Sequence, residues 1–260
     1  MILLESICVV YGGKKVLDNL NLTIEAGEFI SVCGQTGCGK STMLRLILGA
    51  ERPSSGRVLI EGRELPRPDR HRGYVPQKYS LFPDRTVLDN ITFGPEMEEF
   101  GILGRLTPAF RRRRRELRDQ AHEFLRQMGL QEADAGKYPD QLSGGMQQRV
   151  AIAQALIMRP KILLMDEAFS ALDPRTRLDM QRLLRKLWAE TGTTILFVTH
   201  NVAEAVYLGT RVVGLGQARV LFDINVPDSA RGQDRERFEK LVAESSHVEQ
   251  ADYEVSELTT

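Results

Sequence analysis

A glycine-rich octet, GQTGCGKS at positions 34–41, constrains the fold of this chain more than any other feature. It matches the pattern G-x-x-x-x-G-K-[ST], in which a curled backbone points consecutive N–H groups at phosphate oxygens. An apolar run at 28–33 precedes the octet, and apolar residues at helical spacing follow from Lys40. This context predicts a strand, a phosphate-binding loop and a helix whose N-terminus faces the phosphates.

The side chains of this loop have separate predicted tasks. We expect Lys40 to reach the β- and γ-phosphates, and the Ser41 hydroxyl to bind Mg²⁺. The Thr42 hydroxyl is a further donor, expected at the α-phosphate. The complete set of predicted phosphate-binding residues is Gly34, Gln35, Thr36, Gly37, Cys38, Gly39, Lys40, Ser41 and Thr42.

The order of the remaining patterns indicates an α/β fold. Continuous apolar runs at 162–165 and 194–199 alternate with helical patterns, as in a parallel sheet covered on both faces. Between about 90 and 158 the strand patterns vanish and helical spacing takes over. We therefore predict a parallel-sheet core, an antiparallel β portion at the N-terminus and an inserted helical subdomain.

Charge and hydropathy limit the possible partners. Lys plus Arg is 35 and Asp plus Glu is 35, whereas domains that bind nucleic acid usually carry a basic excess. No apolar run approaches the ~20 residues needed to cross a bilayer. The apolar start at 1–10 contains Glu5 and has no basic residue, unlike a signal peptide. We expect no nucleic-acid partner, a cytoplasmic location, and a membrane role only through other subunits.

Two adjacent carboxylates, Asp166 and Glu167, end the apolar strand at 162–165. Taken alone, a strand that ends in solvated acids is the simpler interpretation. In a nucleotide-binding sheet, however, this end lies beside the phosphate loop, and alternation along a strand lets neighbouring acids take different roles. We expect Asp166 to hold Mg²⁺ through a water, and Glu167 to polarise the attacking water as a general base.

The octet LSGGMQQR at 142–149 is the most specific motif in the chain. Ser143 is predicted to cap a helix, while Gly144 and Gly145 expose backbone N–H groups, so this helix start is a second anion site. An ordinary helix cap would explain Ser143 but not the whole octet. The segment resembles the signature motif of ATP-binding-cassette (ABC) ATPases, which have a P-loop NTPase (RecA-like) core.

The resemblance extends over about residues 3–219 and implies roles for four further side chains. It implies that Tyr11 stacks on adenine, that Gln77 contacts Mg²⁺ or the lytic water, and that His200 contacts the γ-phosphate. The segment SALD, which ends at Asp173, matches the D-loop that communicates across a dimer. A lone turn tyrosine or strand-end histidine is commonly structural, so these roles depend on the whole set of motifs.

The resemblance also implies an architecture. It implies a single ABC ATPase domain at 1–260, with a nucleotide-binding core at 1–89 plus 159–225, a helical signature subdomain at 90–158 and a C-terminal tail at 226–260. Two chains would enclose two ATP molecules. Each ATP would contact the phosphate loop of one chain and Ser143 and Gly145 of the other.

Weaker matches concern the kind of transporter that ATP hydrolysis by this chain would drive. Residues 77–94 look like the motor subunits of importers, and 207–215 with 222–224 resemble the nitrate/sulfonate/taurine importer group. The implied partners are a second ABC ATPase chain, transmembrane permease subunits and, indirectly, a solute-binding protein, with the chain peripheral on the cytoplasmic face of the cell membrane. The alternatives are an ABC exporter motor and a soluble ABC ATPase, although this chain shows no heptads for the long coiled coils of DNA-repair members.

Five consecutive arginines occupy positions 111–115. A solvated helix start is the favoured interpretation of this run. The functional alternative is contact with anionic lipid, worth ~1 kcal/mol per basic residue near such a surface.

Overall fold

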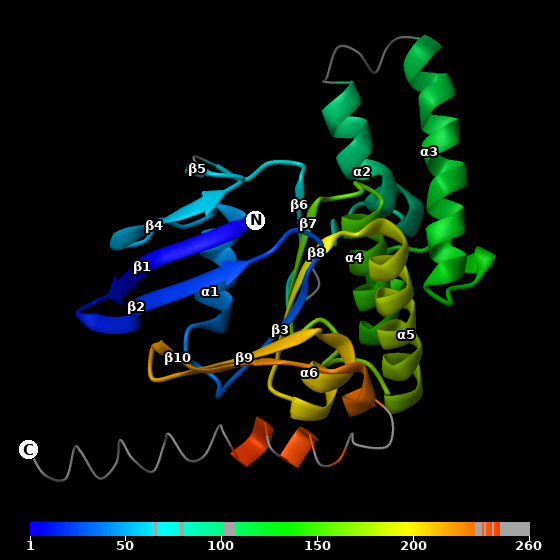
Figure 1. The fold of residues 1–260 in the computed structure, drawn as a ribbon. Helices are drawn as coiled ribbons and strands as arrows, with labels where there is room; N and C mark the ends of the chain where they lie inside the picture. The colour runs from blue at the N-terminus through cyan, green and yellow to red at the C-terminus, as the bar shows by residue number, and fades with distance from the viewer. Residues whose placement is uncertain are drawn as a thin grey trace, which may run out of the picture. The chain divides into compact units, whose positions relative to one another are not determined.

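A computed structural model describes residues 1–64, 67–78, 81–100, 108–231, 236, 238–240 and 242–244 of the chain (Figure 1). The chain forms two compact units. Unit 1 comprises Met1–Asp69, Leu164–Glu167 and Trp188–Thr260, and unit 2 comprises Arg70–Leu163 and Ala168–Leu187. No helix among the described residues combines the length and apolar character needed to cross a membrane.

Unit 1 contains an antiparallel sheet in the order β2-β1-β4-β5, drawn blue to cyan in Figure 1. Its strands are β1 (Ile2–Tyr11), β2 (Lys14–Ile24), β4 (Ser55–Ile60) and β5 (Arg63–Glu64). Apolar residues of β1 such as Leu4, Ile7 and Val9 are buried while their neighbours are more exposed, as expected for a sheet with one face on the core. The predicted antiparallel portion at the N-terminus is confirmed.

The second sheet of unit 1 supplies the parallel strands, in the order β10-β9-β3-β8-β7. Its strands are β3 (Phe29–Cys33), β7 (Ile162–Asp166, entering unit 1 at Leu164), β8 (Thr194–Thr199), β9 (Arg211–Gly216) and β10 (Arg219–Asn225). Strand β3 is parallel to β8 and β9, and β9 forms an antiparallel hairpin with β10. Every residue of β3, β7 and β8 is buried, which explains their unbroken apolar sequences and confirms the α/β class.

The helices of unit 1 are α1 (Lys40–Leu48), α6 (Val202–Leu208) and the 3-10 turn η4 (Asp228–Arg231). A cluster of apolar side chains joins α6 and β9 to the C-terminal segment, in which Val242 is fully buried beside Val206 and Val212. The predicted C-terminal tail is helical at 236, 238–240 and 242–244, while 245–260 lie outside the described residues.

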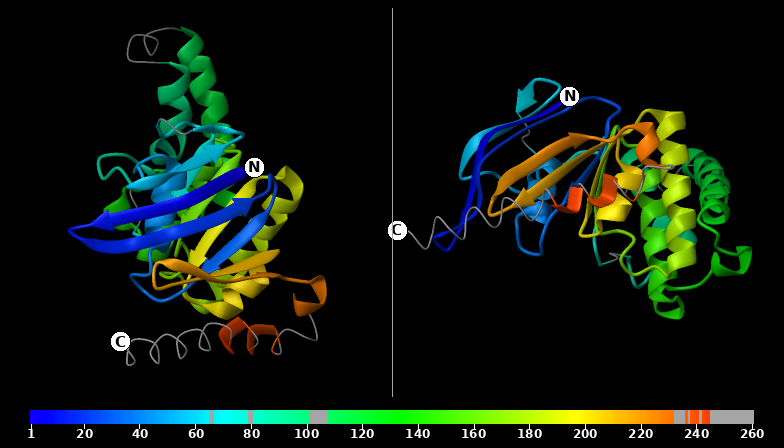
Figure 2. Two further views of the ribbon diagram at one scale, coloured as in Figure 1. Left: turned by 60° about the vertical axis from the view of Figure 1, so that its left-hand side comes forward. Right: turned by 60° about the horizontal axis from the view of Figure 1, so that its bottom comes forward.

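Unit 2 is mainly helical and includes most of the predicted helical region at 90–158. It contains β6 (Arg72–Val75), α2 (Val87–Glu99), α3 (Pro108–Gln127), η2 (Glu132–Asp134), η3 (Pro139–Gln141), α4 (Gly144–Leu156) and most of α5 (Pro174–Thr191). Helices α2 and α3 lie side by side in both views of Figure 2. The first turns of α3 are charged and carry no apolar periodicity, so its start at Pro108 is not marked by the apolar pattern of the sequence.

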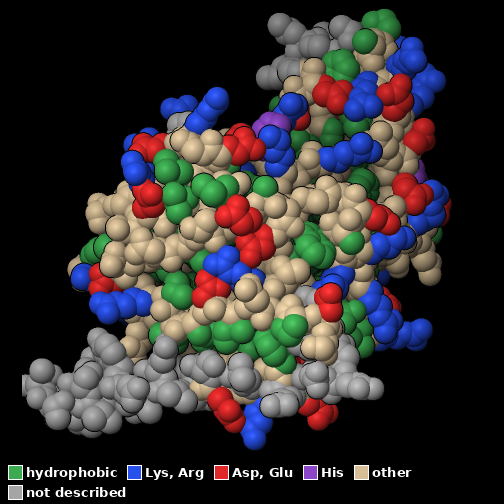
Figure 3. Space-filling view, viewed as in Figure 1, with side chains coloured by type: hydrophobic (Ala, Val, Ile, Leu, Met, Phe, Trp, Pro, Cys, Tyr) green, Lys and Arg blue, Asp and Glu red, His purple; other side chains and the backbone are tan. Residues whose placement is uncertain are grey.

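Ion pairs hold these first turns of α3 against α2. Arg113 binds both carboxylate oxygens of Glu99 at 2.8 Å, and Arg114 lies 3.1 Å from Asp89 and 3.2 Å from Glu96. Figure 3 shows the resulting mixture of basic and acidic side chains over this helix pair. The arginine run is therefore only partly a solvated face, since two of its five members pair with acids of α2.

Candidate active site

The predicted phosphate loop lies between β3 and α1 in unit 1, and its glycines are required by close contacts. A Cβ atom at Gly34 would stand 2.1 Å from the carbonyl oxygen of Leu215. At Gly39, where φ is +102°, a Cβ would lie 2.6 Å from the Leu17 side chain and 2.8 Å from the Val16 oxygen. These positions exclude any larger residue, so the backbone can form a tight curve before α1.

The N-terminus of α1 is suited to binding an anion. Among the described residues, no side chain caps its first turn, and Gly39 occupies the N-cap position in a left-handed conformation. The first N–H groups of α1 are therefore available to a ligand, and the helix dipole favours a negative one. The Lys40 side chain is buried, and its Nζ donates to the carbonyl oxygens of Gly34 at 2.7 Å and Gln35 at 2.8 Å. The ammonium group thus lies on the loop itself, and this donor set fits the phosphates of a nucleotide.

The two predicted acids differ in their surroundings. Asp166 is buried at the end of β7. Glu167 follows with φ +46°, and its N–H donates to the carbonyl oxygen of Val198 at 2.9 Å. A left-handed conformation at a residue other than glycine costs about 1–3 kcal/mol and persists where the surrounding structure imposes it. Such strain is typical of functional positions, which supports a special role for Glu167.

His200 lies next to Glu167, with Nδ1 3.2 Å from Oε2. The preceding residue is anchored firmly: the Thr199 hydroxyl donates to the buried Glu204 at 2.6 Å and accepts from the Asn201 N–H at 3.0 Å. Asn201 in turn caps α6 by accepting from the Glu204 N–H at 3.1 Å. Our sequence reasoning missed Thr199 and Glu204. The available signal was an Asn followed three residues later by a Glu at the start of an apolar helix.

Unit 1 brings the phosphate loop, the two acids and His200 to one edge of its parallel sheet. Cys33, directly before the loop, is paired with Thr199, directly before His200. The bond from Glu167 to Val198 brings the acidic pair to the same edge. The carboxyl ends of parallel strands are where open α/β sheets bind their ligands. Tyr11 ends β1 in the same unit, and this residue is 46% exposed, which leaves it accessible for stacking.

The signature residues belong to unit 2. Ser143 caps α4 as predicted, its Oγ accepting from the Met146 N–H at 3.3 Å. Gly144 and Gly145 form the first turn, and a Cβ at Gly145 would lie 3.4 Å from the Leu172 side chain. The start of α4 therefore packs against the D-loop segment, and both motifs belong to one unit.

The remaining two predicted residues also lie in unit 2. Gln77 is exposed directly after Pro76, whose carbonyl oxygen accepts from Nε2 of the fully buried Gln148 at 3.3 Å. This bond ties the signature helix to the segment of Gln77. Asp173 caps α5 by accepting from the Thr176 N–H at 3.0 Å, and hydrogen bonds from the Thr176 side chain and from this N–H lower the pKa of the Asp173 carboxyl.

An open pocket of about 300 Å³ lies within unit 2. Its lining includes Arg70, Tyr74, Pro76, Gly94 and Met158. It thus borders the strand that leads to Gln77 and both α2 and α4.

Comparisons with known proteins agree with this arrangement. The sequence profile of the family described as ABC transporter matches residues 17–170. The chain is 46% identical over 231 residues to an uncharacterised ABC transporter ATP-binding protein of Methanocaldococcus jannaschii, covering 87% of this chain and 80% of that protein. It is 43% identical over 213 residues to the taurine import ATP-binding protein TauB of Escherichia coli K12, covering 81% and 78%.

Two further matches extend the comparison. The chain is 40% identical over 223 residues to the spermidine/putrescine import ATP-binding protein PotA of Pasteurella multocida, covering 85% of this chain and 57% of PotA. Among solved structures, the dimeric post-hydrolysis state of the ATP-binding cassette MJ0796 bound to ADP and Pi matches with a TM-score of 0.77 and 35% identity. That match covers 87% of this chain and 99% of the cassette.

Proposed function

Because the chain belongs to the ABC transporter family and is an ATPase of its importer group, we propose that it is the motor subunit of a small-solute importer. In this proposal two copies close around two ATP molecules, and hydrolysis reopens them to drive separate membrane subunits. The observation that carries the proposal is the convergence of the phosphate loop, Glu167 and His200 at one sheet edge.

Each side chain of unit 1 has a task in this mechanism. Glu167 accepts a proton from the water that attacks the γ-phosphate. Lys40 and His200 donate hydrogen bonds to oxygens of that phosphate, where negative charge develops. The Thr42 hydroxyl and the loop N–H groups hold the α- and β-phosphates, and Tyr11 stacks on the base. Ser41 and Asp166 would hold Mg²⁺, together with Gln77 of unit 2 as the family resemblance implies, and the ion would neutralise phosphate charge.

The signature residues serve the second nucleotide in this proposal. The exposed start of α4, with Ser143, Gly144 and Gly145, is a helix N-terminus suited to an anion. We assign it to the γ-phosphate of the ATP held by the other copy, with the Asp173 segment at the contact between copies. The dimeric cassette MJ0796 with ADP and Pi supports this arrangement.

The unit 2 pocket is our proposed docking point for a permease subunit. Pro76 lines it directly before Gln77, so a docked segment would touch the chain that leads to the nucleotide. Docking there makes the chain peripheral on the cytoplasmic face of the cell membrane, with a solute-binding protein as an indirect partner. The 43% identity to TauB favours a solute of the nitrate, sulfonate or taurine type.

The test is ATP hydrolysis by the wild type and by Glu167→Gln, with size exclusion in MgATP. We expect the variant to lose hydrolysis by a factor of at least about 100 and to elute as a dimer only when ATP is present. The exposed Glu25→Gln is the matched control and should hydrolyse ATP at the wild-type rate. Full hydrolysis by Glu167→Gln would rule out Glu167 as the base.

A further inference from the structure

A row of three hydrogen bonds connects Tyr11 to the phosphate-binding helix. The Tyr11 hydroxyl donates to Oε2 of Glu51, and Oε1 of Glu51 accepts from Arg45 Nε at 2.6 Å. Arg45 Nη2 donates in turn to the Thr42 hydroxyl at 3.2 Å. The row lies within unit 1 and links the residue proposed to stack on the base to a residue proposed to bind phosphate.

The backbone that follows α1 places Glu51 beside the Arg45 side chain. Helix α1 ends at Leu48 and is capped by Gly49, where φ is +80°, and the N–H groups of Ala50 and Glu51 both donate to the Arg45 oxygen, at 3.0 and 3.3 Å. A glycine in the left-handed conformation is the usual way for a chain to reverse after a helix. The reversal returns Glu51 to the last turn of α1, beside the Arg45 side chain.

Separate bonds bring the end of β1 to the same place. The Ser54 N–H donates to the Cys8 oxygen at 2.8 Å, and the Ser54 hydroxyl accepts from the Val10 N–H at 3.1 Å. Tyr11 is therefore held next to the segment of Glu51 whether or not their side chains are bonded. Loss of the side-chain bond should free the Tyr11 ring without displacing the strand.

The bond from Arg45 also orients the Thr42 hydroxyl. Thr42 is 5% exposed, and its oxygen already accepts from Arg45, so its own hydrogen is directed to another acceptor. A phosphate oxygen in the loop is such an acceptor. Burial opposes the charge of Arg45, but hydrogen bonding to Tyr11 and the charge of Glu51 raise the pKa of Arg45 above its ordinary value.

We propose that Glu51 and Arg45 are positioning residues that couple the Tyr11 ring over the nucleobase to the Thr42 hydroxyl at the phosphates. The coupling makes the site favour a nucleotide with an aromatic base over a bare polyphosphate. This inference rests on the proposed role of Tyr11 in base stacking. Glu51 bonds the Tyr11 hydroxyl directly and reaches Thr42 only through Arg45, whereas Arg45 bonds the Thr42 hydroxyl itself and keeps that bond in Glu51→Gln.

The test measures dissociation constants of MgADP and of magnesium pyrophosphate by calorimetry for the full chain. The variants are Tyr11→Phe, which keeps the ring but loses the hydroxyl, Glu51→Gln, and the two combined. We expect each to weaken ADP binding by about fivefold and to leave pyrophosphate binding unchanged. Because both substitutions break the same link, the double variant should lose no more than either single one. Arg45→Gln should weaken both ligands.

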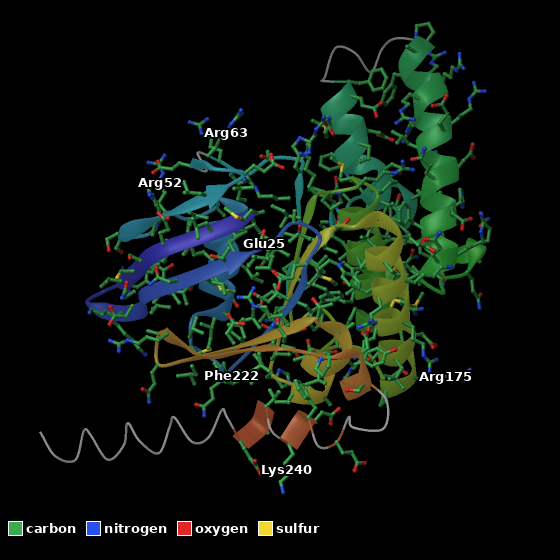
Figure 4. The ribbon with its side chains drawn as sticks, viewed as in Figure 1. Glu25, Arg52, Arg63, Arg175, Phe222 and Lys240 are labelled. Atoms are coloured by element: carbon green, nitrogen blue, oxygen red, sulfur yellow. The ribbon has the colours of Figure 1, made fainter. Side chains whose placement is uncertain are left out.

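Two results would overturn the proposal: additive losses in the double variant, or equal losses of ADP and pyrophosphate binding in Glu51→Gln. Glu25→Gln and Arg52→Gln, exposed positions labelled in Figure 4, are matched controls that should keep both constants. A purely structural role of Glu51 would lower the Tm and weaken both ligands together. The binding measurement needs no ATP hydrolysis, so failure of this inference can be told apart from failure of the proposed transport function. A chain that binds ADP but does not hydrolyse ATP would still test the inference.

Discussion

Nδ1 of His200 lies 3.2 Å from Oε2 of Glu167, and the two side chains differ sharply in exposure. The carboxylate side chain is 14% exposed and the imidazole 62%. A largely buried acid thus anchors a ring that remains accessible from the solvent. In the proposed mechanism, the ring leaves the acid to reach a phosphate, which releases Glu167 to accept a proton from water.

His200→Ala is expected to lower kcat for ATP by about 100-fold while KM changes little, because the ring acts on charge that develops during the reaction. Steady-state hydrolysis with purified protein measures both constants. The exposed His71→Ala is the control and should leave both unchanged. An unaltered kcat in His200→Ala would remove His200 from the mechanism.

Thr199→Val should destabilise the protein by about 1–3 kcal/mol, because it removes the hydroxyl that binds buried Glu204 at 2.6 Å. It should also lower kcat, since Thr199 holds the backbone directly before His200. Urea unfolding and hydrolysis rates test the two effects. Thr191→Val, at an exposed position, should stay within about 0.5 kcal/mol of the wild type.

Gly34→Ala and Gly37→Ala should differ in unfolding free energy although both alter the same loop. A Cβ at Gly34 would meet the Leu215 oxygen at 2.1 Å, so the backbone must move, at a cost of about 3 kcal/mol. At Gly37 no described atom lies within 4 Å of the added Cβ, and only the strain of φ +85° remains, about 1–2 kcal/mol. Equal losses in urea unfolding would contradict this ranking.

Arg211→Met should cost roughly 3 kcal/mol of unfolding free energy, because Arg211 binds Asp223 at 2.6 Å, Glu28 at 3.1 Å and the Thr23 oxygen at 2.9 Å. Its side chain is 19% exposed, so the acid left behind at Glu28 would lack a well-placed cation. The matched control is Arg219→Met. Arg219 pairs with Asp18 at 3.1 Å but is 62% exposed, so its loss should cost less than about 1 kcal/mol.

The α2–α3 contact should weaken in acid. The hydrogen bond from Arg113 lowers the pKa of Glu99 below its ordinary value of 4.5. Since the folded-state pKa is the lower one, the ion pair stabilises fully above pH 4.5, and its contribution is lost as the pH falls through the folded value. The stability difference between wild type and Glu99→Gln, measured by unfolding across this range, should shrink as the pH falls. A difference that stays constant with pH would show that the charge of Glu99 contributes nothing to stability.

Structural features that depend only on a few neighbouring residues could be predicted from the sequence. The phosphate loop, the Ser143 cap and the buried strands β3, β7 and β8 follow from the sequence, because residue type and spacing within a few positions decide them. The family followed from the same local motifs. Tyr11 and His200 are different, since a lone tyrosine or histidine carries no local signal and each received a role only from the surrounding motifs.

Arg149 illustrates what only the tertiary structure decided. It closes the signature octet, yet its Nη1 donates to the oxygens of Met128 and Gly129 at 3.0 Å, satisfying carbonyls at the end of α3. The bonds from Arg113 to Glu99 and from Tyr11 to Glu51 likewise join residues that are not neighbours in the chain. The sequence by itself determined the backbone patterns and the chemistry of the loop. Packing decided which charged side chains meet, because surface acids and bases are too numerous for their pairing to be specified until the elements lie against one another.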